Sequence, residues 1–132
     1  MLEFQLTPDG SRVVYRADQG VNERFDVYSV PVDTRTGLQK LDPQLQAGRD
    51  VTHFRISPDG AFVAYRADQD LDDVFELFAA PIGGRREAVK LHHALTRGGA
   101  ASNFDFTPDG RQVLFLLDRA APLAFELHAA WI

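Results

Sequence analysis

The sequence repeats itself every fifty residues. The phrase Phe-x-apolar-Ser/Thr-Pro-Asp-Gly occurs three times at this offset, without insertion or deletion, at residues 4–10, 54–60 and 104–110. A period of this length indicates stacked units, each of which is one supersecondary structure that cannot bury its apolar surface alone. The sequence therefore predicts one partial repeat domain over residues 1–132, with units at 1–50, 51–100 and 101–132, the last of them incomplete.

Apolar residues within one unit recur at a period of two, as in Phe54 and Ile56 or Val63 and Tyr65. This is strand spacing, and turn-forming residues separate the short runs. Since a four-stranded sheet needs neighbours on both faces, the prediction is all-β: β-propeller blades made of four-stranded antiparallel sheets, two full blades plus a truncated third. Strands are expected in the second unit near residues 51–56, 62–67, 74–81 and 87–92, with weak helical spacing only at 42–47 and 91–96.

The Pro-Asp-Gly phrase has the composition of a tight turn. Proline presets φ at a turn corner, aspartate accepts a hydrogen bond from a nearby amide, and glycine supplies the positive φ that closes a hairpin. These residues are therefore predicted to be structural. They are Pro8, Asp9, Gly10, Pro58, Asp59, Gly60, Pro108, Asp109 and Gly110.

The repeated motifs resemble those of the TolB-like propellers, which are built from the WD40-like PD40 repeat. The resemblance rests on Ser/Thr-Pro-Asp-Gly, on a second strand that ends near an aspartate, and on third strands such as Phe25–Tyr28 and Phe75–Phe78. It covers essentially the whole chain. It implies a scaffold or a gate, as in the periplasmic component of the Tol–Pal system or the propellers of prolyl-oligopeptidase-type peptidases.

The number of units bears on the partners of the chain. Closed propellers typically have about 4–8 blades, and this sequence supplies fewer than three complete units. We therefore expect the partner to be another protein or further blades of the same propeller, and a head-to-tail homo-oligomer is one way to provide them.

Charge and composition exclude several classes of function. The 19 acidic residues outnumber the 14 basic ones, so no nucleic acid is expected as a partner, and the lack of cysteine removes disulfides and thiolate metal sites. No run approaches the roughly 18 apolar residues of a membrane span. The expected compartment is the cytoplasm if Met1 is the true start, and the periplasm if the chain belongs to a longer exported protein.

One loop has the pattern of a metal site. Asp68, Asp70 and Asp72 alternate, which is how calcium loops present hard oxygen ligands. However, the loop lacks the glycine and the glutamate of the EF-hand pattern, and the equivalent loops of the other units do not repeat it. A solvated hairpin turn is the preferred interpretation, so no cofactor or metal is predicted.

Arginine and histidine residues at the strand ends form a second group of candidates. Arg16 and Arg66 each precede an aspartate by two residues, and we expect ion pairs that lock neighbouring blades rather than a ligand surface. The third unit has Leu116 in their place. His92 and His93 are adjacent on a predicted strand, so they should point to opposite faces and lie at the surface.

Motifs of the common catalytic classes are missing from the sequence. It has no nucleophile elbow, phosphate-binding loop or His-Glu-x-x-His motif, so no catalytic residue is predicted and the chain is not expected to be an enzyme. The leading hypothesis is a non-catalytic propeller segment that serves as a scaffold for protein–protein interaction. The alternative is part of the gating propeller of a prolyl-oligopeptidase-type serine peptidase, and a weaker alternative is a hydrolase or lyase with its site in the propeller channel.

Overall fold

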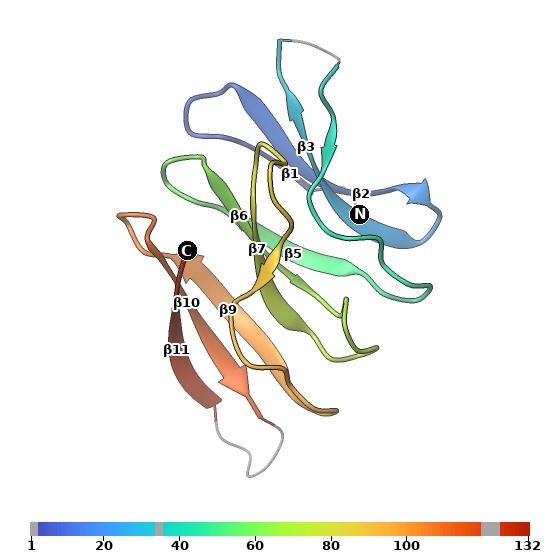
Figure 1. The fold of residues 1–132 in the computed structure, drawn as a ribbon, viewed down its shortest axis with the longest axis vertical. Coiled ribbons are helices and arrows are strands. Elements are labelled where there is room, and N and C mark those ends of the chain that lie inside the picture. The colour runs from blue at the N-terminus through green and yellow to red at the C-terminus, as the bar shows by residue number, and fades with distance from the viewer. Residues whose placement is uncertain (1–2, 34–35, 120–124) are drawn as a thin grey trace.

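A computed structural model describes residues 3–33, 36–119 and 125–132, which form three antiparallel sheets. Figure 1 shows the sheets side by side along the longest axis, in chain order. The first sheet contains β1 (Glu3–Leu6), β2 (Arg12–Val21), β3 (Arg24–Pro31) and β4 (Gln39–Lys40). The second contains β5 (Val51–Ile56), β6 (Phe62–Ala67), β7 (Glu76–Pro81) and β8 (Val89–Lys90), and the third contains β9 (Ala100–Phe106), β10 (Gln112–Asp118) and β11 (Phe125–Trp131).

The sheet topology confirms the predicted fold class of two four-stranded blades and a shorter third. Each complete sheet has its strands in chain order, and the third sheet has the order β11-β10-β9. The first two predicted strands of the second unit match β5 and β6, whereas β7 begins at Glu76 rather than at residue 74, and β8 is only 2 residues long. The segments 42–47 and 91–96 are irregular rather than helical, and among the described residues no helix could span a membrane.

Leucines in and next to the irregular segments explain the apparent helical spacing. Leu41 and Leu45 are buried in the cluster formed between the first and second blades, and Leu91 and Leu95 pack against the equivalent cluster between the second and third. A spacing of four residues is typical of a helix face. Here it serves a loop that crosses from the outer strand of one blade to the first strand of the next.

The Ser/Thr-Pro-Asp-Gly turn has the same hydrogen bonds in all three blades. In the second blade, the Ser57 hydroxyl donates to Asp59 Oδ1 at 2.6 Å, and the Ala61 amide donates to the same oxygen at 3.1 Å. The Ser57 Oγ also accepts from the Phe62 amide at 2.9 Å. These donors hold the pKa of Asp59 below its usual value, so the turn is closed by an ionised carboxylate at neutral pH.

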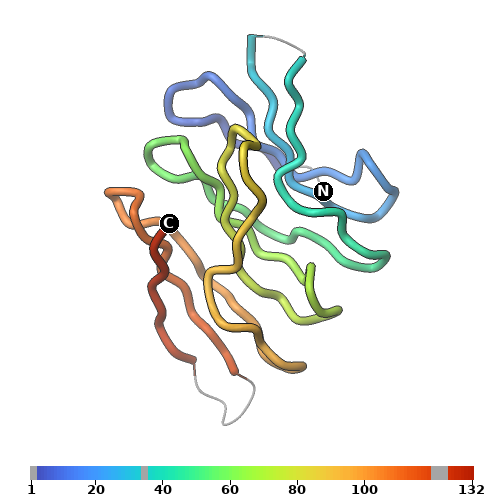
Figure 2. The backbone as a smooth tube through the Cα atoms, viewed as in Figure 1, coloured from blue at the N-terminus to red at the C-terminus, as the bar shows by residue number. Residues whose placement is uncertain are grey.

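The turns also stack from one blade to the next. Gly10, Gly60 and Gly110 have φ angles of 72°, 72° and 70°, and Figure 2 shows the three turns along the same side of the molecule. A Cβ atom on Gly60 would lie 3.2 Å from Pro8 Cδ, and one on Gly110 would lie 3.5 Å from Pro58 Cδ, whereas one on Gly10 would meet no atom within 4 Å. The turns of the second and third blades therefore pack against the proline of the blade before them.

The apolar core lies between the blades rather than inside any one of them. Val63, Tyr65 and Ala67 on one face of β6 belong to the cluster shared with the first blade. Ala64, on the opposite face of the same strand, belongs to the cluster shared with the third blade. Strand alternation thus directs successive side chains of the second blade to two different neighbours.

A pair of glycine substitutions tests the stacking of the turns. Gly10→Ala should destabilise the chain by about 1–2 kcal/mol, because an alanine at positive φ is strained. Gly60→Ala has the same backbone strain and in addition crowds Pro8, so it should cost about 1 kcal/mol more. Urea unfolding followed by circular dichroism measures both. Equal losses of stability would contradict the stacked arrangement.

Candidate functional site

Arg66 joins the second blade to the third. Its Nε donates to the carbonyl oxygen of Ala101 on β9 at 2.7 Å, and its Nη1 donates to Thr52 Oγ1 at 3.1 Å. The guanidinium lies over the Phe75 ring, 4.3 Å from its centroid. Burial lowers the pKa of Arg66, but arginine stays protonated at neutral pH. The contact is therefore a charge-assisted hydrogen bond to a backbone carbonyl of the next blade.

Arg16 makes the equivalent joint between the first and second blades. Its Nη1 donates to the carbonyl oxygen of Val51 at 3.2 Å, and its guanidinium lies 4.6 Å from the centroid of the Phe25 ring. Its Nε lies 3.8 Å from Glu3 Oε2, an ion pair within its own blade. Both arginines thus connect neighbouring blades as expected, but the hydrogen bonds that cross between blades run to backbone carbonyls rather than to carboxylates.

The first blade has an uncovered face. Phe4 is 71% exposed, although its equivalent Phe54 is 2% exposed against the neighbouring blade. A hollow of about 460 Å³ lies on this face, lined in part by Phe4, Val13 and Tyr15. We call this the leading face, and it is defined by Phe4, Leu6, Val13 and Tyr15.

The opposite end of the molecule carries a second uncovered face. Leu127 and Trp131 on β11 are each 72% exposed, although Leu77, the equivalent of Leu127, is fully buried against the third blade. Leu116 pairs with Leu127 in the register of β10 and β11, so it lies on the same face, where the first two blades have their arginine. We call this the trailing face, and it is defined by Leu114, Leu116, Phe125, Leu127 and Trp131.

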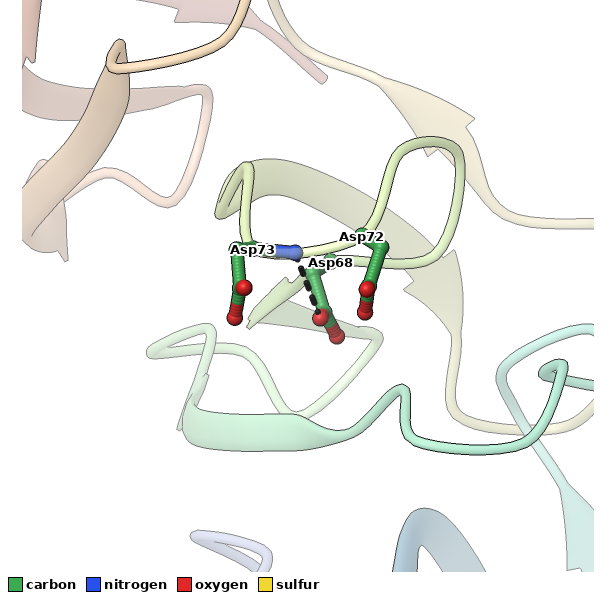
Figure 3. A group of neighbouring side chains, drawn as sticks. All are labelled: Asp68, Asp72 and Asp73. Atoms are coloured by element: carbon green, nitrogen blue, oxygen red, sulfur yellow. Dashed lines mark hydrogen bonds between the residues drawn. The ribbon is translucent and has the colours of Figure 1, made fainter.

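The carboxylates of the candidate calcium loop do not gather as the alternating pattern suggests. Asp68, Asp72 and Asp73 bring their oxygens within 4.8 Å of one another, and Figure 3 shows all three side chains directed to the same side of the loop. Asp70 Oδ2 instead lies 2.7 Å from Lys90 Nζ. Asp70 thus forms an ion pair with Lys90 near the outer strand, and Asp73 rather than Asp70 joins Asp68 and Asp72 in the carboxylate cluster.

Asp68 is engaged in holding the hairpin. Its Oδ1 accepts from the Asp50 amide at 2.7 Å, and its Oδ2 accepts from the Asp73 amide at 3.1 Å. In the first blade, Asp18 similarly accepts from the Glu23 amide at 3.3 Å. Because the amide five residues ahead is bound in both blades, the arrangement fits the preferred interpretation of a structural hairpin turn.

The fourth strands of the first two blades contain a charged network that sequence reasoning missed. Lys40 Nζ lies 3.2 Å from Asp26 Oδ1 and 2.7 Å from Asp42 Oδ2. Burial raises the pKa of Asp42 to about 7, against the opposing effect of Lys40. In the second blade, Lys90 Nζ lies 2.9 Å from Glu76 Oε1. Asp26 and Glu76 are fifty residues apart, as are Lys40 and Lys90. This recurrence at the repeat offset is the signal that could have revealed the two ion pairs.

The expectation of surface histidines is wrong for His92. Its side chain is 4% exposed, and its Nε2 accepts a hydrogen bond from the Leu77 amide at 3.0 Å. Burial lowers the pKa of His92, which suits a neutral ring that accepts at Nε2. His93 is exposed, as expected. His92 therefore secures the connection to the outer strand of the second blade.

Comparisons with known proteins support the propeller fold. No protein-family model and no curated protein matches the sequence. Among solved structures, the chain is similar to an oligogalacturonate lyase from Vibrio parahaemolyticus, with a TM-score of 0.61 and 15% identity over 96% of this chain and 36% of that one. It is also similar to a structure from a study of two prolyl endopeptidases, with a TM-score of 0.56 and 18% identity over 98% of this chain and 20% of that one.

A third similar structure is the β-propeller domain of the Trilobed protease from Pyrococcus furiosus. The TM-score is 0.55 and the identity is 14%, over 97% of this chain and 42% of that one. The chain thus spans less than half the length of each of these proteins. At these identities the likeness shows a shared fold, and the chain consists of propeller blades.

Replacement of Arg66 tests the joint between blades. Arg66→Leu removes two hydrogen bonds and leaves the Ala101 carbonyl without its cationic donor, so we expect a loss of about 1–3 kcal/mol in the free energy of unfolding. Arg55→Leu is the matched control, since Arg55 is exposed on the neighbouring strand β5 and should change stability little. Denaturant unfolding of both variants measures the difference. If Arg66→Leu is as stable as the parent chain, the assignment of Arg66 as a joint is wrong.

Proposed function

We propose that the chain is a non-catalytic propeller segment that acts as a protein–protein interaction scaffold. The observation that carries the proposal is the exposure of the leading and trailing faces, whose equivalents between blades are buried. Burial of apolar surface is favourable by roughly 25 cal/mol per Å², so an exposed blade face attracts a complementary surface. The surface of best fit is another blade of the same repeat.

The faces are complementary in a defined direction. Each joint within the chain pairs the trailing side of one blade with the leading side of the next, as between the second and third blades. A trailing face should therefore bind a leading face rather than a second trailing face. For the 132-residue chain in isolation, a second copy supplies further blades, and a head-to-tail contact that closes by rotation gives a ring.

The two enzyme classes named as alternatives have structural counterparts among the similar proteins, a prolyl endopeptidase and a lyase. Their structural similarity to this chain supports a common fold. At their low sequence identity, no catalytic residue can be transferred to this chain. The scaffold proposal instead draws on exposed surfaces of this chain itself.

Light scattering after gel filtration tests the self-association. We expect a particle of twice the 14.7 kDa mass of one chain, because two chains of three blades each would form the ring. Phe4→Asp and Leu127→Asp each place a charge on one exposed face, and each should convert the particle to a monomer without a loss of folded structure. A parent chain that is monomeric at all concentrations would contradict the proposal, as would variants that stay associated.

A further inference from the structure

The first strands of the three blades share a position that carries a polar side chain. β1, β5 and β9 each lie at one end of their sheet. Glu3, His53 and Asn103 are fifty residues apart, and each precedes a phenylalanine. Since the residue before the phenylalanine differs in every blade, the fold does not require a particular side chain at this position. These side chains are therefore available for binding.

A hollow of about 380 Å³ lies beside these residues, and we call it the β5–β9 hollow. Phe54 and Phe104 contribute to its lining, and the polar lining residues are Glu3, His53, Arg55, Arg66, Ser102 and Asn103. Most of them belong to β5 and β6 of the second blade and β9 of the third, two blades that pack against each other. Small-ligand sites have volumes of about 300–1,000 Å³, so the hollow has room for a small molecule.

Arg66 is held in a fixed position in this lining. Its Nε and Nη1 donate to the Ala101 carbonyl and the Thr52 hydroxyl, and its guanidinium lies over the Phe75 ring. Its Nη2 makes no hydrogen bond with any residue that the structure describes. A guanidinium that is already positioned and has an unused amino group loses little conformational entropy when it binds an anion.

Three further donors in the lining are unused. The side chains of Arg55, Ser102 and Asn103 make no hydrogen bond with the described part of the chain. Among the described residues, Glu3 is the only acidic one in the lining, and its Oε2 lies 3.8 Å from Arg16 Nε. The lining thus has two arginines and one carboxylate, in a chain whose net charge is −5. This excess of donors and of positive charge favours an anion.

The backbone on both sides of the hollow is irregular. The pairing register of β5 with β6 shifts between Val51 and His53, and that of β9 with β10 shifts opposite Leu114–Leu116. Asn103 has a φ of 45°, whereas its equivalents Glu3 and His53 are not in the left-handed region. A bulge changes the direction of nearby side chains, and a left-handed φ is unfavourable for a residue with a Cβ atom. The third blade thus departs from the repeat at a residue that lines the hollow.

We propose that the β5–β9 hollow binds the carboxylate of a small organic acid. Arg55 and Arg66 bind the carboxylate, and Ser102 and Asn103 supply neutral donors. Glu3 adds a negative charge to the lining, which repels a phosphate dianion more strongly than a carboxylate monoanion. The inference goes beyond the scaffold proposal and is independent of it, since no residue of the leading or trailing face lines the hollow.

Glycolate is the probe, because it carries one carboxylate and one small hydroxyl group. It is titrated into the ¹⁵N-labelled full chain at constant ionic strength, with sodium chloride and inorganic phosphate as parallel arms. The backbone amides of Ser102 and Asn103 and the Nε–H group of Arg66 should shift with a dissociation constant of about 1–10 mM. Chloride should give no saturable shift, and phosphate should bind more weakly than glycolate.

Arg55→Gln tests the contact with the carboxylate. Arg55 is exposed and makes no hydrogen bond with its side chain to the described residues, so the variant should fold as the parent chain does. Its affinity for glycolate should fall about tenfold, because a charged donor is lost. Arg111→Gln is the matched control, since it makes the same change of charge at an exposed arginine outside the lining. It should keep the affinity of the parent chain.

Asn103→Gly separates binding from stability. Glycine adopts a left-handed φ without strain, so the variant should unfold at the same urea concentration as the parent chain or at a higher one. The substitution also removes the side-chain amide, so glycolate binding should weaken severalfold. A purely structural role for Asn103 would give the opposite pattern, a loss of stability with unchanged binding.

Three results would overturn the inference: no saturable shift up to about 50 mM glycolate, equal binding by the Arg55→Gln chain, or tighter binding of phosphate than of glycolate. The particle mass tests the blade faces, and the titration tests the hollow. A monomeric parent chain that binds glycolate therefore refutes head-to-tail self-association and keeps the hollow as a site, and a dimer that does not bind glycolate does the reverse.

Discussion

The packing of one blade against the next is the interaction on which the whole structure depends. A four-stranded sheet with apolar residues on both faces has no interior of its own, so its stability comes from its neighbours. The core clusters accordingly span pairs of blades. Three recurrent contacts make this packing directional: an arginine that reaches a carbonyl of the next blade, a turn glycine against the preceding proline, and a leucine-bearing loop that crosses between sheets.

The repeat and its strands could be predicted from the sequence because they depend on local chemistry. Period-two patterning located β5 and β6 to the residue, and the turn phrase implied the positive φ of Gly60. The partners of polar side chains could not be predicted so well. Arg66 donates to a backbone carbonyl 35 residues away, and because every residue has such a carbonyl, the residue types do not reveal this partner. Asp70 pairs with Lys90, which lies on another strand, so the sequence of the loop alone does not predict the pair.

Directional stacking gives the two ends of the molecule different properties. Phe4 lies on the leading face, whose equivalent in the second blade packs against the preceding blade. Leu127 lies on the trailing face, whose equivalent in the second blade packs against the following blade. The trailing face has Leu116 where the first two blades have arginine, so a blade bound there would be held more by apolar burial than by a hydrogen bond from arginine to a backbone carbonyl. A two-chain ring would contain two joints, each between a trailing face and a leading face, whereas a dimer joined through a single pair of identical faces would leave the other two faces exposed.

Mixing two face variants tests directional association most directly. Phe4→Asp chains retain an intact trailing face, and Leu127→Asp chains retain an intact leading face. Analytical ultracentrifugation should show each variant as a monomer alone and a one-to-one dimer in the mixture, because the mixture restores one complete joint. A mixture that stays monomeric while the parent chain associates would contradict head-to-tail stacking, as would either variant forming dimers by itself.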